Sequence, residues 1–74
     1  MSDLELKLRI LKTKLHALED EKEEKFRVVN KLKNTEYYDK AFMGFLEFLD
    51  DYYKDKQRLE DDIKMVETEM EKQN

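Results

Sequence analysis

The chain has 74 residues and a formal net charge of −4, with 46% charged residues, one glycine, no proline and no cysteine. A chain of this length forms a single domain, residues 1–74, which buries only about 60% of its unfolded surface and so has little stability to spare. The absence of cysteine excludes disulfides and thiolate metal sites, and the acidic balance argues against the strongly basic surface of a typical nucleic-acid-binding domain.

The first predicted helix covers about residues 3–33 and begins at a capping box. In Ser2-Asp3-Leu4-Glu5 the Ser2 hydroxyl is placed to accept a hydrogen bond from the Glu5 amide. Apolar residues then follow at alternating spacings of four and three, the a/d pattern of a coiled-coil seam: Leu4, Leu8, Leu11, Leu15, Leu18, Val29 and Leu32. Lys22 and Lys25 occupy the two seam positions between Leu18 and Val29.

Residues 19–25, with the sequence EDEKEEK, contain no apolar side chain. If they formed a loop, the chain would fold into a compact monomeric bundle of three or four helices. Glutamate and lysine are good helix formers, and neither glycine nor proline interrupts the stretch. We therefore predict that the helix continues through these residues, and keep the compact bundle as the alternative.

Asn34 and Thr35 form the clearest turn signal in the middle of the chain. Asparagine tolerates the left-handed backbone conformation that ends many helices, and threonine is a favourable N-cap for the next one. The chain is therefore predicted to reverse at residues 34–35, and a second helix is predicted over about residues 36–72.

The second predicted helix carries an unbroken heptad stripe along its length: Tyr38, Phe42, Phe45, Leu49, Tyr52, Lys56, Leu59, Ile63, Val66 and Met70. Residues 1–34 hold nine basic and seven acidic side chains, and residues 35–74 hold six and twelve, so the two halves are complementary in charge. These patterns predict an all-α protein, a long antiparallel helical hairpin of coiled-coil type.

Seven of the eight aromatic side chains lie between residues 37 and 53. The apolar side chains of this stretch span an arc of about 180° around the helix, whereas one antiparallel neighbour covers little over 100°. We therefore expect a second copy of the chain to pack here, giving a dimeric four-helix bundle. The residues assigned to this protein interface are Tyr37, Tyr38, Phe42, Phe45, Leu46, Phe48, Leu49, Tyr52 and Tyr53.

The sequence offers no set of side chains suited to catalysis. His16 is the sole histidine, and there is no cysteine nucleophile and no glycine-rich loop. We expect no enzyme activity, no cofactor, no metal site and no small-molecule substrate. No apolar stretch resembles a signal peptide or a membrane span, and we expect a soluble, cytoplasmic protein that does not bind a membrane.

These features predict a non-catalytic protein–protein interaction module, such as a small adaptor, assembly factor or inhibitor, whose partners are a second copy of itself and a larger protein. One alternative is a nucleic-acid-binding accessory protein of phage type, acting in replication, recombination or with a helicase. The bias of twelve lysines to three arginines is typical of the A+T-rich genomes of many phages. The residues that would contact nucleic acid are Lys7, Arg9, Lys12 and Lys14. A further alternative is an acidic inhibitor that mimics the charge of DNA.

Overall fold

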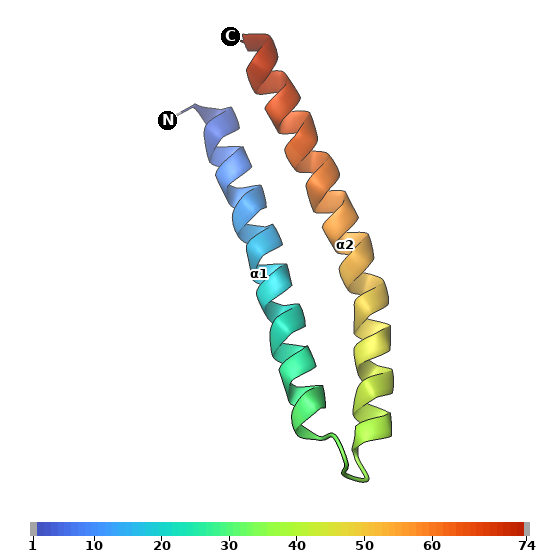
Figure 1. The fold of residues 1–74 in the computed structure, drawn as a ribbon. Helices are drawn as coiled ribbons and strands as arrows, with labels where there is room; N and C mark the ends of the chain where they lie inside the picture. Colours follow the sequence, from blue (N-terminus) through green and yellow to red (C-terminus); the bar gives the residue numbers. More distant parts are fainter. Residues whose placement is uncertain (1, 74) are drawn as a thin grey trace.

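A computed structural model describes residues 2–73 and shows two α-helices that run antiparallel, side by side (Figure 1). α1 spans Asp3–Lys31 and α2 spans Tyr38–Gln73. No strand occurs within residues 2–73, so the predicted all-α helical hairpin is confirmed for this part of the chain. The molecule is elongated, with extents of 57 × 19 × 12 Å.

α1 begins at the predicted cap and continues without a break. The Ser2 hydroxyl accepts a hydrogen bond from the Glu5 amide at 3.2 Å, and acidic side chains occupy the first turn, where the helix dipole favours negative charge. Residues 19–25 are helical, as their composition predicted. The compact bundle of three or four helices requires a turn within this stretch and is therefore not the fold of residues 2–73.

The connection between the helices is longer than the predicted turn at residues 34–35. α1 ends at Lys31 instead of about residue 33, and α2 begins at Tyr38 instead of about residue 36. Residues 32–37 therefore form the connection, and the predicted boundaries on both sides of it were wrong by two residues.

Two hydrogen bonds of the Thr35 side chain explain the longer connection. The Thr35 hydroxyl donates to the Leu32 carbonyl at 2.6 Å and accepts from the Tyr37 amide at 3.3 Å. A threonine side chain that bonds to nearby backbone can hold a local turn, and here both bonds lie within residues 32–37. α2 begins directly after this turn, at Tyr38.

Asn34 has the left-handed backbone expected of it, with a φ of 72°. A side chain with a Cβ is strained in this conformation by roughly 1–2 kcal/mol, a cost that asparagine reduces and glycine avoids. We expect Asn34→Ala to lower the free energy of unfolding by about 1 kcal/mol, and the melting temperature by roughly 4–8 °C, and Asn34→Gly to melt at or above the parent. Thermal circular dichroism of the three proteins at one concentration measures the difference. An alanine variant that melts with the parent would contradict it.

The core is a single row of side chains between the helices. Five apolar side chains are buried: Leu11, Val29, Phe45, Tyr52 and Val66. All five belong to the two predicted seam stripes, because each helix of a pair buries only the one stripe that faces its neighbour. Within residues 2–73, neither helix combines the length and the apolar character that crossing a membrane requires.

Candidate interaction surface

The structure divides the nine predicted interface residues between the core and the surface. Phe45 and Tyr52 are only 8% and 2% exposed and belong to the core of the single hairpin. Three more are half-buried at the edge of the core: Tyr38, Phe48 and Leu49. The remaining four are between 39% and 61% exposed: Tyr37, Phe42, Leu46 and Tyr53. α1 therefore covers the middle of the aromatic arc and leaves both of its edges uncovered.

Phe26 joins this aromatic cluster from α1, although it was absent from the predicted interface. Its ring lies 5.8 Å from that of Phe45, and a series of ring contacts continues along α2 through Phe48 and Tyr52 to Tyr53, at 6.2, 6.1 and 5.1 Å. The signal that could have identified Phe26 is its position three residues before Val29, which places it beside the seam. Half of its side chain remains exposed, at 51%.

Three lysines complete the aromatic cluster by lying over its rings. The Lys22 ammonium is 5.0 Å from the centre of the Tyr52 ring and 5.8 Å from that of Tyr53. Lys56 lies 5.8 Å from Tyr52, and Lys25 lies 5.1 Å from Phe48. A lysine stem covers apolar surface while its ammonium is attracted to the ring face. Lys22 and Lys25 thus face the aromatic stretch, as the seam pattern predicted.

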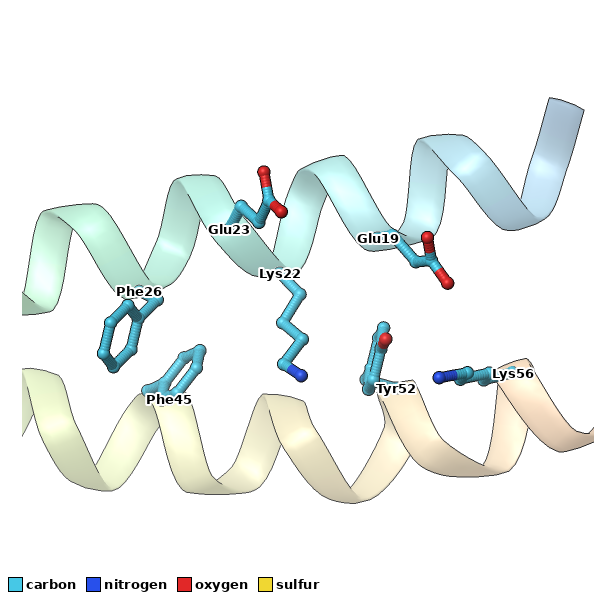
Figure 2. Close-up of a pocket in the computed structure, with 7 residues that line it drawn as sticks. All are labelled: Glu19, Lys22, Glu23, Phe26, Phe45, Tyr52 and Lys56. Carbon is cyan, nitrogen blue, oxygen red and sulfur yellow. The ribbon is translucent and has the colours of Figure 1, made fainter.

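A groove opens between the helices beside Lys22 (Figure 2). In Figure 2, Phe26 and Phe45 face one another, and Lys22 extends from α1 towards α2. The residues that line the groove are Glu19, Lys22, Glu23, Phe26, Phe45, Tyr52 and Lys56.

Three exposed side chains of α2 extend the apolar surface of this groove. Tyr53 is on the groove side, because the Lys22 ammonium lies over its ring as well as over Tyr52. Leu46 and Phe42 precede Tyr53 by seven and eleven residues, close to two and three helical turns, and so lie on the same side of α2. We call this side of the hairpin the groove face.

The opposite side, which we call the glycine face, is also uncovered. Val28 of α1 lies there, in a depression shared with Ala41, Gly44 and Phe48 of α2. A Cβ atom added at Gly44 would meet nothing within 4 Å. Glycine within a helix is about 1 kcal/mol less favourable than alanine, and no contact inside the hairpin requires it at this position.

The four basic residues of the predicted nucleic-acid contact are not brought together. Arg9 and Lys12 line one depression with Glu5, whereas Lys7 lines a second and Lys14 a third. Nucleic-acid binding relies on several adjacent positive charges along one surface. The structure offers one adjacent pair of these four, and the nucleic-acid contact stays a prediction.

The ion pairs within residues 2–73 each join side chains of one helix. They are His16–Asp20 at 3.7 Å, Glu24–Arg27 at 3.2 Å, Asp50–Lys54 at 3.1 Å and Glu69–Lys72 at 3.9 Å. The hydrogen bond from the Lys54 ammonium to Asp50 raises the pKa of Lys54. In the same part of the chain, no three histidine, aspartate or glutamate side chains come together as the ligands of one metal ion would. Contact between the helices therefore depends on apolar and aromatic side chains and on the α1 lysines that lie over the rings of α2.

Comparisons of the chain with protein-family models, with curated proteins and with solved structures find no match.

Proposed function

We propose that this chain is a non-catalytic protein–protein interaction module of the cytoplasm. Its aromatic half joins two copies into a four-helix bundle, and the bundle presents its helix surfaces to a larger protein. The observation that supports the proposal is the uncovered apolar surface around a thin core. Four large side chains that surround Phe45 and Tyr52 on the groove face are 39–56% exposed: Phe26, Phe42, Leu46 and Tyr53.

The size of the chain makes this uncovered surface energetically important. Full burial of one phenylalanine or leucine side chain contributes about 1.5–3 kcal/mol, and a small domain has a total stability of only about 5–15 kcal/mol. A second copy that covered the partly exposed side chains would therefore add a stabilisation comparable with the stability of the hairpin alone. The thin core also leaves little other apolar burial to stabilise a single copy.

Sedimentation equilibrium with two double variants tests the proposal. At concentrations of roughly 10–100 µM, we expect the parent protein to have the mass of two chains and a melting temperature that rises with concentration. Leu46→Glu with Tyr53→Glu should have the mass of one chain and a melting temperature independent of concentration, because both charges would be buried without partners in the dimer.

The matched control places the same charges at the other end of the hairpin. Leu6 and Ile10 are 48% and 47% exposed, close to the 44% and 56% of Leu46 and Tyr53. The two pairs are thus matched in exposure, but Leu6 and Ile10 lie outside the groove face. The double variant Leu6→Glu with Ile10→Glu should for this reason remain dimeric. A parent protein that sediments as a single chain across this range, with a melting temperature independent of concentration, would contradict self-association.

A further inference from the structure

The groove face carries charges of both signs among its apolar side chains. Lys22 and Lys56 approach Tyr52 from the two sides of its ring, while Glu19 and Glu23 stand on α1 along the same groove (Figure 2). None of the ion pairs within residues 2–73 includes any of these four residues. Two positive and two negative side chains therefore surround the apolar groove without pairing to one another.

We propose that the second copy docks on the groove face, with α1 of each copy lying over α2 of the other and its glutamates reaching Lys56. This inference rests on the proposed self-association and deepens it, because it selects one of two uncovered faces. In a twofold interface the same patch contributes from both copies, so the patch must complement itself. Equal numbers of acidic and basic side chains around a shared apolar centre meet that requirement.

The net charges of the two helices favour this arrangement over pairing of like helices. Residues 1–34 have a net charge of +2, from nine basic and seven acidic side chains, and residues 35–74 have −6, from six and twelve. Two α2 helices laid against each other would bring together two strongly acidic surfaces. α1 of one copy over α2 of the other brings opposite net charges together, which favours this orientation over the alternatives.

The apolar area of the groove face is of the size that a stable interface requires. A large aromatic side chain presents about 150–250 Å², so three such side chains and one leucine that are about half exposed offer roughly 300–500 Å² per copy. A standard interface buries about 800 Å² per partner, of which somewhat more than half is apolar. In the aromatic half of the hairpin the glycine face offers less, because Val28 and Tyr37 are its exposed large side chains there and Lys25 covers Phe48. Ile10, five helical turns before Val28, lies on the same side of α1 but near the other end of the hairpin.

Complementary charge reversal tests which face is occupied. One variant, Lys22→Glu with Lys56→Glu, makes the groove face wholly acidic, and the other, Glu19→Lys with Glu23→Lys, makes it wholly basic. Each variant alone should self-associate at least about 100-fold more weakly than the parent, because like charges meet across the interface. An equimolar mixture should form a heterodimer with an affinity within about tenfold of the parent dimer. Sedimentation equilibrium with one variant fluorescently labelled measures all three affinities.

A charge-matched control lies outside the groove. Lys14→Glu with Lys25→Glu changes the net charge of the chain by the same amount as the acidic variant, and both residues line other depressions. This control should self-associate as the parent does. If the single variants unfold at working concentrations, the mixture should regain the helical circular dichroism of the parent.

The outcomes separate this inference from the function on which it rests. A dimeric parent whose two groove variants also remain dimeric, or whose mixture fails to associate, would overturn the docking on the groove face. Loss of association in the control with retention in the groove variants would assign the second copy to the glycine face. A monomeric parent would overturn self-association itself.

Discussion

Replacement of Phe45 by alanine is expected to unfold much of the hairpin. Phe45 is 8% exposed, and its ring contacts Phe26 of α1 at 5.8 Å and Phe48 at 6.2 Å. Truncation of a buried phenylalanine costs about 3–5 kcal/mol, which approaches the total stability of a small domain. The melting temperature should therefore fall by at least about 12 °C, with a reduced helical circular dichroism signal at room temperature.

Met43→Ala provides the control for this variant on the same stretch of α2. Met43 is 59% exposed and lies two residues from Phe45, on the side of α2 that faces away from the seam. Its truncation should change the free energy of unfolding by less than about 0.5 kcal/mol. Equal melting temperatures for the two variants would mean that the row of rings is not the core.

Glu21→Pro is expected to lower the melting temperature about as much as Phe45→Ala does. Glu21 lies inside α1, in the middle of the charged stretch at residues 19–25, where its side chain is exposed. Proline in a helix interior removes one backbone hydrogen bond and clashes with the preceding turn, at a cost of about 3 kcal/mol or more. We expect a loss of cooperative melting or a fall in melting temperature of roughly 12 °C or more, measured by circular dichroism.

Asp3→Pro is the control for Glu21→Pro, because it introduces a proline without breaking the helix. Asp3 is the first residue of α1, where the amide has no partner within the helix and proline is tolerated. This variant should melt within a few degrees of the parent. If Glu21→Pro melts as Asp3→Pro does, residues 19–25 are a loop in solution and the chain is not a simple hairpin.

The sequence was sufficient to predict the helical hairpin and the residues of its core. Apolar residues at alternating spacings of four and three lie on one side of a helix, which is the side that can be buried against a neighbour. The two seam stripes therefore include all of the buried side chains: Leu11, Val29, Phe45, Tyr52 and Val66. The continuity of α1 through residues 19–25 followed from the helix-forming tendency of glutamate and lysine. Both predictions depend on local preferences and periodicity, which are properties of the sequence itself.

Features that depend on the relative placement of side chains were harder to predict. The length of the connection depends on the two bonds of the Thr35 hydroxyl, which compete with the first turn of α2. The exposure of Phe42, which belongs to the seam stripe and is nevertheless 39% exposed, depends on how α2 is rotated against α1. The contact of Phe26 with Phe45 depends on the same rotation, since Phe26 lies one position outside the seam stripe.

The elongated shape of the hairpin also determines how it behaves in gel filtration. Its radius of gyration is 16.9 Å, whereas a compact domain of the same 74 residues has a radius of about 11 Å. A radius of 16.9 Å is typical of a compact domain of roughly 200 residues. An elongated molecule has a larger hydrodynamic radius than a compact one of the same mass, so a single hairpin should elute ahead of a globular protein of 74 residues. Elution volume therefore reflects the shape of the hairpin as well as its mass, and the number of chains has to be determined by a measurement of mass.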